Sequence, residues 1–343
     1  LGLIEGAAQA LLALMTAFAG WHSDRLRRRV PYVRWGYGLA IASKAGLALA
    51  FHWTIVLGLR LADRFGKGLR GAPRDALLAD LAEGRRGAAF GLHRGMDTAG
   101  ALVGTLLAAG LLAWLPGRYR LVFALTAIPG ALAVMLTFTL REPKAGPDEA
   151  TSSRAPLPIA AARSLPRGFW IAAATLWVLA LGTVSEAFLI LRATQQGFAD
   201  TSAVLAYAGF NAVYALSAYP AGVLSDRFGR VRLLGLGWAV YALTMAVALS
   251  LQGTWVAWLF PLLGLHLGLT HGVGKAWIAD LAPRDLRGTA LGVYQLGSGL
   301  ALLAGGVVVG LLWDRVGPSA SFGWALGLGL VGLGCLPLAA RRE

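Results

Sequence analysis

The feature that most constrains this chain is a series of apolar blocks, each roughly 20 residues long, separated by short polar loops. A helix needs about 20 apolar residues to cross the ~30 Å hydrocarbon core of a bilayer. Of the 343 residues, 57% are hydrophobic and only 14% are charged, whereas a soluble domain is ~45–50% apolar and ~25% charged. The pattern therefore predicts an all-α membrane protein and argues against a soluble enzyme.

The apolar blocks give eleven candidate transmembrane spans. They lie near 2–20, 33–51, 54–69, 88–114, 118–140, 168–191, 202–223, 233–250, 254–278, 289–312 and 320–339. The longest polar stretch between them, 141–167, is rich in Pro, Ser and charge and is predicted to be a cytoplasmic linker with a short surface helix near 158–164. It divides the chain into an N-terminal transmembrane bundle, 1–140, and a C-terminal transmembrane bundle, 168–343.

The two bundles repeat each other. The segment GWHSDRLRRR at 20–29 matches GVLSDRFGRV at 222–231, and ADLAEGRRGAAFG at 79–91 matches ADLAPRDLRGTALG at 279–292. Such duplication is frequent in secondary transporters. At the same offset, the counterpart of span 168–191 would precede residue 1, so we expect the first helix of a six-plus-six plan to be missing from this sequence.

The positive charge has an uneven distribution along the chain. A net charge of +14 would suggest nucleic acid in a soluble protein, but most Lys and Arg here lie in alternate loops, which is typical of a cytoplasmic face. The opposite loops hold Arg118, Arg120, Arg192 and Arg315. We therefore expect the linker and the C-terminus in the cytoplasm, the lipid bilayer as a partner, and no nucleic acid.

One loop motif, G-x-x-x-D-R-x-G-R-R/K, occurs twice. The second copy has Gly222, Asp226, Arg227, Gly229 and Arg230, and the first has Gly20, Asp24, Arg25, Arg28 and Arg29, with Arg27 at the expected glycine. With the duplication, the linker and the charge bias, the chain resembles bacterial exporter-like members of the major facilitator superfamily (MFS). The resemblance implies the MFS fold, with two pseudo-symmetric six-helix bundles around a central cavity. It also implies a monomer in the plasma (bacterial inner) membrane, with helices 2–6 and 7–12 present here.

The motif also has a physical interpretation. Its aspartate can cap the positive end of a neighbouring helix, and its arginines can pair with acidic residues such as Asp75 or Asp80. Such contacts would hold the transporter in one state and break when the cavity opens inward. The alternative is that the arginines only fix the topology.

Ionisable residues inside a membrane are costly and mark substrate or ion pathways by default. The candidates for a substrate or proton pathway are Glu5, Gln9, Arg60, Asp63, Arg64, His93, Arg94, Asp97, Glu186, Asn211, His271 and Lys275. The first-half charges can instead be structural salt bridges near an interface, and Gln9 and Asn211 can simply join helices. Glu186 is either an unpaired carboxylate in the span 168–191 or a partner of His271 or Lys275.

No catalytic constellation is visible in the sequence. His266 and His271 lack carboxylate or thiol company, so no metal is expected, and RFGKGLRG lacks the spacing of a phosphate loop. We expect no enzyme and no cofactor, but a secondary active transporter that exports a small organic molecule by alternating access, coupled to protons. The alternatives are an importer, symporter or facilitator, of a small anionic metabolite, and a non-transporting scaffold or sensor.

Overall fold

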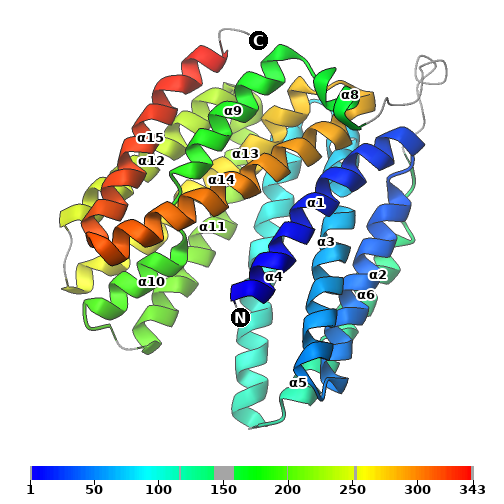
Figure 1. The fold of residues 1–343 in the computed structure, drawn as a ribbon, viewed down its shortest axis with the longest axis horizontal. Coiled ribbons are helices and arrows are strands. Elements are labelled where there is room, and N and C mark those ends of the chain that lie inside the picture. Colours follow the sequence, from blue (N-terminus) through cyan, green and yellow to red (C-terminus); the bar gives the residue numbers. More distant parts are fainter. Residues whose placement is uncertain (1, 116, 143–157, 199, 251–252, 341–343) are drawn as a thin grey trace. The chain divides into compact units, whose positions relative to one another are not determined.

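The computed structural model describes the chain except for residues 1, 116, 143–157, 199, 251–252 and 341–343 (Figure 1). The described chain is helical, and no strand occurs in it. The helices are α1 (Gly2–Leu26), α2 (Val30–Gly46), α3 (Trp53–Leu81), α4 (Arg86–Trp114), α5 (Tyr119–Leu125), α6 (Ala127–Thr137), α8 (Pro158–Arg163), α9 (Arg167–Leu181), α10 (Glu186–Gln195), α11 (Asp200–Phe228), α12 (Arg230–Ser250), α13 (Leu259–Leu281), α14 (Arg287–Arg315) and α15 (Pro318–Ala340). Short 3-10 turns cover Leu47–Leu49, Gly253–Trp258 and Arg284–Leu286.

The all-α membrane class is confirmed. Six segments of the described chain are long and apolar enough to cross a bilayer: Tyr119–Thr137, Arg167–Gln195, Arg230–Ser250, Gly253–Leu281, Arg284–Arg315 and Pro318–Pro337. The remaining predicted spans are also helical over most of their length. The full count of eleven spans stays a prediction.

The chain forms two compact units that are not continuous in sequence. Unit 1 comprises Leu1–Leu81, Gly104–Leu165 and Ala282–Leu296, and unit 2 comprises Ala82–Val103, Pro166–Leu281 and Gly297–Glu343. The start of α4 thus belongs to unit 2, and the start of α14 belongs to unit 1. The predicted division into two bundles, 1–140 and 168–343, rests on the sequence repeat and stays a prediction.

In unit 1, α3 packs along both α1 and α2. Small residues allow the helices to approach: a Cβ on Gly36 would lie 2.6 Å from the backbone oxygen of Gly66, and one on Gly68 would lie 2.8 Å from that of Leu12. Small residues at helix crossings are what membrane helices need for close packing. These glycines therefore allow α3 to approach α1 and α2 closely.

In unit 2, α13 packs against α11 and α12, and α15 packs against α12 and α9. The core of this unit holds the fully buried side chains of Phe169, Tyr241, Phe260, Trp277 and Phe322.

Two predicted spans are broken. Residues 118–140 form α5 and α6, and residues 168–191 form α9 and α10 with a break at 182–185. Ser185 ends the break, because its hydroxyl accepts a hydrogen bond from the Ala187 N–H and so caps α10. The predicted span 168–191 is therefore not one continuous helix, and Glu186 lies in the first turn of α10. The short helix predicted near 158–164 is confirmed as α8.

Candidate gating and transport site

Asp24, near the end of α1, closes the start of α14. Its carboxylate accepts hydrogen bonds from the N–H groups of Gly288 (3.2 Å) and Thr289 (2.6 Å) and from the Thr289 hydroxyl (2.8 Å). The first N–H groups of a helix have no partner within it and carry the positive end of its dipole. Burial raises the pKa of Asp24, and the nearby Arg29 guanidinium and the Thr289 donors oppose that rise.

Asp80, at the end of α3, lies between two arginines of unit 1. Arg29 pairs with Asp80 and with Asp24 (3.2 Å), and Arg287 pairs with Asp80 at 2.5 Å. The Asp80 side chain is only 6% exposed. We call Asp24, Arg29, Asp80 and Arg287 the first network. Arg29 thus contacts Asp80, one of the two carboxylates named from the sequence.

A second network in unit 2 repeats the first. Asp226 accepts hydrogen bonds from the N–H groups of Gly87 (2.9 Å) and Ala88 (2.7 Å), at the start of α4. Arg230 pairs with Asp226 (2.6 Å) and Asp280 (2.9 Å), and Arg86 pairs with Asp280 at 2.7 Å. The second network is therefore Asp226, Arg230, Asp280 and Arg86. In both units, a motif loop from one half of the sequence closes a helix start from the other half.

The two loops differ by one residue. The sequence aligns Arg28 with Arg230, but Arg29 makes the pairs that Arg230 makes, and Arg28 is exposed. The turn itself is preserved, because Arg27 adopts the left-handed backbone (φ 53°) that Gly229 adopts in the second loop (φ 95°). The longer first loop, with α2 beginning at Val30, explains the shift.

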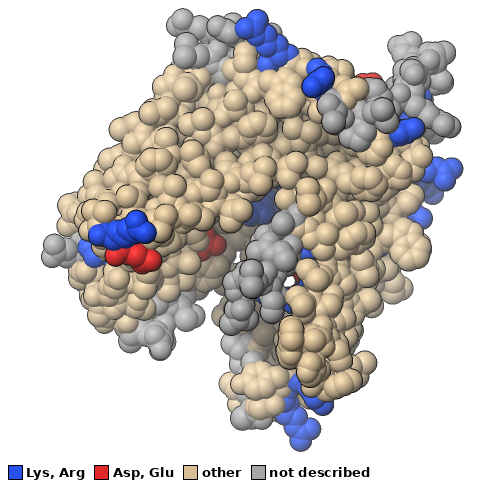
Figure 2. Space-filling view, in the orientation of Figure 1, with Lys and Arg blue, Asp and Glu red and all other residues tan. Residues whose placement is uncertain are grey.

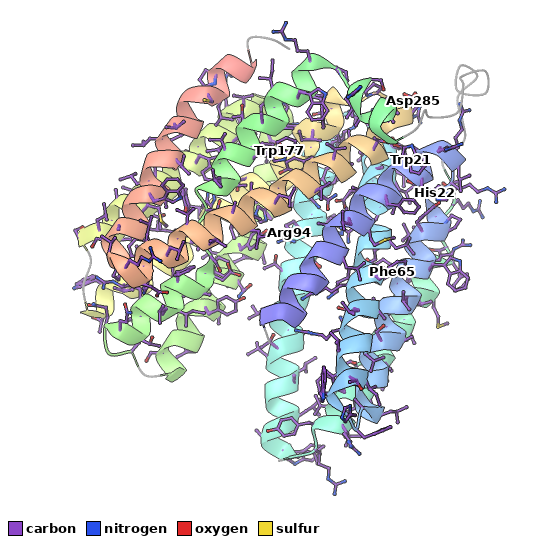
Figure 3. The ribbon with its side chains drawn as sticks, in the orientation of Figure 1. Trp21, His22, Phe65, Arg94, Trp177 and Asp285 are labelled. Atoms are coloured by element: carbon purple, nitrogen blue, oxygen red, sulfur yellow. The ribbon has the colours of Figure 1, made fainter. Side chains whose placement is uncertain are left out.

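The outer arginines of the motif lie apart from the networks. Arg25 stacks over the Trp21 ring at 5.5 Å, and Arg227 is exposed. Trp21 and its neighbour His22 lie near the end of α1 (Figure 3). The arginines after each turn, rather than the one beside each aspartate, therefore make the network contacts.

Glycines permit two close helix crossings, that of α1 with the start of α14 and that of α11 with the start of α4. A Cβ on Gly20 would lie 2.2 Å from the Gly288 oxygen, and a Cβ on Gly222 would lie 2.1 Å from the Gly87 oxygen. Any larger residue would force the backbones apart. The motif glycines are therefore required by close contact, in addition to the charges of the motif.

Tyr214 of α11 is the centre of a separate polar cluster in unit 2. Its hydroxyl accepts a hydrogen bond from Arg94 Nε and lies 2.6 Å from His271 Nδ1. Arg94 also pairs with Asp97 one turn further along α4, at 3.1 Å. Glu186 is close enough to interact electrostatically with Tyr214. We call these five residues the Tyr214 cluster; Arg94 is labelled in Figure 3.

Lys275 is near this cluster, since its charge acts on His271. Of the sequence-based list, Arg94 and His271 contact Tyr214 directly. Asp97 pairs with Arg94, and Glu186 and Lys275 act on the cluster through their charge. His93 is the half-buried neighbour of Arg94 on α4. Tyr214 is not among the pathway residues predicted from the sequence, because nothing in the local pattern marks a hydroxyl that joins two helices.

The other predicted pathway residues lie elsewhere. Arg60 is exposed, Arg64 is half-buried, and Asp63 pairs with Lys67 one turn along α3 at 2.8 Å. The Asn211 amide donates to the Tyr207 carbonyl of its own helix (2.9 Å). Glu5 and Gln9 are on α1, but their side chains fall outside the described residues.

Charge is sparse on the helix flanks of the described chain. Figure 2 shows a face made mostly of uncharged side chains, with Lys and Arg at helix ends. Among the described residues, no group of three or more His, Cys, Asp or Glu side chains could hold a metal ion. The two networks and the Tyr214 cluster provide hydrogen bonds and charged groups, which suit binding and proton transfer.

Fold and site together define a multi-pass membrane protein built by duplication. The model of the Major Facilitator Superfamily matches residues 1–207 and 187–343. The chain is 28% identical over 329 residues to an uncharacterised MFS-type transporter of Methanocaldococcus jannaschii, covering 94% of this chain and 81% of that protein. It is 35% identical over 141 residues to a multidrug resistance protein of Citrobacter koseri, covering 38% and 33% of the two chains.

A solved structure agrees in fold. The fucose:proton symporter of E. coli superposes with a TM-score of 0.82 at 15% identity, covering 98% of this chain and 90% of that one. The chain belongs to the major facilitator superfamily and is a membrane transporter, not an enzyme.

Proposed function

We propose that this transporter exports a small organic molecule in exchange for protons. The observation that carries the proposal is the Tyr214 cluster, in which Asp97 pairs with Arg94, His271 contacts Tyr214, and the charge of Glu186 acts on Tyr214. Ionisable groups at such depth form proton relays in transporters. Export is supported by the partial similarity to a multidrug resistance protein.

The two networks supply the gating part of the proposal. Asp24 and Asp226 each hold the start of a helix from the other half of the sequence. The charge-assisted hydrogen bonds that do so can form in one state and break in another. Alternating access would then break and remake them once per cycle. We further propose that the protein works as a monomer in the bacterial inner membrane, with the linker and the C-terminus in the cytoplasm.

Transport into everted membrane vesicles tests direction and coupling together. Vesicles that contain the protein are energised to acidify the lumen, and uptake of ethidium, a cation, is compared with uptake of carboxyfluorescein, an anion. Ethidium accumulation that collapses when a protonophore removes the pH gradient supports proton-coupled export. Ethidium accumulation that survives the protonophore contradicts proton coupling.

Variants connect the result to the site. Asp97→Asn is expected to abolish gradient-driven uptake, while Glu83→Gln, the same chemical change on an exposed loop, leaves it intact. Release of the anion from the lumen, with no movement of ethidium, would favour an importer of anionic metabolites instead. Movement of neither probe would favour the non-transporting role.

A further inference from the structure

A single side chain holds the break between α9 and α10. The Tyr241 hydroxyl, from α12, accepts a hydrogen bond from the Val184 N–H and donates one to the Gly182 carbonyl, both at 2.8 Å. A continuous helix would satisfy these two backbone groups internally. At the break, one hydroxyl on another helix replaces both bonds.

The surroundings of this contact make it costly to lose. Tyr241 has no exposed surface and Val184 only 1%, so water is not at hand to replace the hydroxyl. An unsatisfied backbone group is expensive in an apolar medium, and membrane proteins therefore pair every such group. Without the hydroxyl, the segment would have to rewind into helix or admit water.

The tyrosine itself has little freedom to move. Its ring centroid lies 5.1 Å from that of Trp238 and 4.7 Å from that of His266, both of which are buried. The His266 ring is fixed in turn, since its Nδ1 lies 2.9 Å from the Gly237 carbonyl oxygen and so donates to it. The hydroxyl is thus a rigid point of attachment on the helices α12 and α13.

What this point positions is Glu186. The break ends at Ser185, whose hydroxyl accepts from the Ala187 N–H, so α10 begins at Glu186. If the break rewound, each residue of α10 would turn by about 100° per added helical residue. The Glu186 charge, which now acts on Tyr214, would then move relative to it.

We propose that Tyr241 is a positioning residue for transport: it clamps the break at 182–185 and so keeps Glu186 in the Tyr214 cluster. The clamp rests on geometry alone. Its effect on transport rests on the proposed proton coupling.

Tyr241→Phe removes the hydroxyl and keeps the ring, and Tyr207→Phe is the matched control on an adjacent helix. Hydrogen exchange of the 182–188 backbone is measured in nanodiscs. Loss of two buried hydrogen bonds should speed exchange of this segment at least about tenfold in Tyr241→Phe and leave it unchanged in Tyr207→Phe. Unchanged exchange in Tyr241→Phe overturns the clamp. If this variant does not fold, the wild type decides: exchange of Val184 as fast as that of an exposed loop overturns the clamp, and helix-like protection supports it.

The pH profile of ethidium uptake separates the two levels. With the clamp lost, the profile should shift toward that of Glu186→Gln, an effect that general loss of stability does not produce. Faster exchange with an unshifted profile refutes the role of Glu186 in coupling, and hence part of the proposed function, while the clamp stands. Faster exchange with a shifted profile supports both.

Discussion

Replacing Gly20 with alanine measures how tight the crossing of α1 and the start of α14 is. The added Cβ would lie 2.2 Å from the Gly288 oxygen and 2.8 Å from its carbonyl carbon. Both atoms belong to backbone and cannot rotate away, so the segments must separate by roughly 1 Å to reach ordinary contact.

Two costs follow from that separation. Overpacking of this kind costs about 1–3 kcal/mol, and moving the start of α14 also stretches the hydrogen bonds of Asp24, each worth about 1 kcal/mol net. We expect Gly20→Ala to lower the free energy of unfolding by about 3 kcal/mol and to slow transport, because the first network loses its geometry. Gly222→Ala should behave alike, since its Cβ would lie 2.1 Å from the Gly87 oxygen.

Thermal melting in detergent, with transport in vesicles, measures both effects. Gly100→Ala is the control, because nothing lies within 4 Å of a Cβ there, and on helix propensity it should be neutral or stabilising by up to about 1 kcal/mol. If Gly20→Ala melts within about a degree of Gly100→Ala and transports normally, the crossing is looser than described and the reasoning fails.

Four further predictions concern the two networks and their loops. Asp80→Asn should cost about 3–5 kcal/mol, because it removes the buried carboxylate that the Arg29 and Arg287 guanidinium groups share. Asp280→Asn should cost less, since Asp280 is 33% exposed, and equal melting temperatures would contradict this. Arg27→Gly should raise the melting temperature, by relieving a left-handed backbone that costs a non-glycine residue about 1 kcal/mol, whereas a drop would show that the side chain matters more. Glu142→Gln should cost about 1 kcal/mol, because Glu142 accepts 2.7 Å hydrogen bonds from the N–H groups of Arg29 and Val30 at the start of α2; unchanged melting would argue against this cap. Because burial raises the pKa of Asp24, the wild type should lose stability relative to Asp24→Asn as the pH rises from about 4 through that raised pKa, and a gap between their melting curves that is constant with pH would count against it.

Much of the architecture could be predicted because its causes are local and repeated. The helices follow from the length of the apolar segments. Asp24 and Asp226 can be picked out because each occupies the same position in a repeated motif. Asp80 could be predicted as a partner because it lies next to a polar loop, at the end of α3. These features depend on composition, on spacing and on charged side chains that need a partner of opposite charge.

Other features depend on contacts between distant segments. The break at 182–185 is stabilised by Tyr241, some sixty residues away, and without that hydroxyl the sequence favours one continuous helix. The shift from Arg28 to Arg29 depends on the length of a turn that Arg27 enters despite its side chain. Tyr214 joins Arg94 to His271 from a third helix, which no periodicity in its own helix could reveal.

The discontinuous make-up of unit 1 has a consequence for how the protein is made. This unit takes its last segment from residues 282–296, so the ribosome must reach Gly288 before Asp24 can accept a hydrogen bond from the Gly288 N–H. Until then, the helices of this unit that are already made carry the Asp24 carboxylate and the close-packing Gly20 without the helix start that covers them. Domains that are contiguous fold as they emerge, but this unit cannot be completed until its distant last segment is made. A chain that stops before this segment would leave Asp24 without the Gly288 and Thr289 N–H groups. The end of α1 would then stay exposed to membrane proteases.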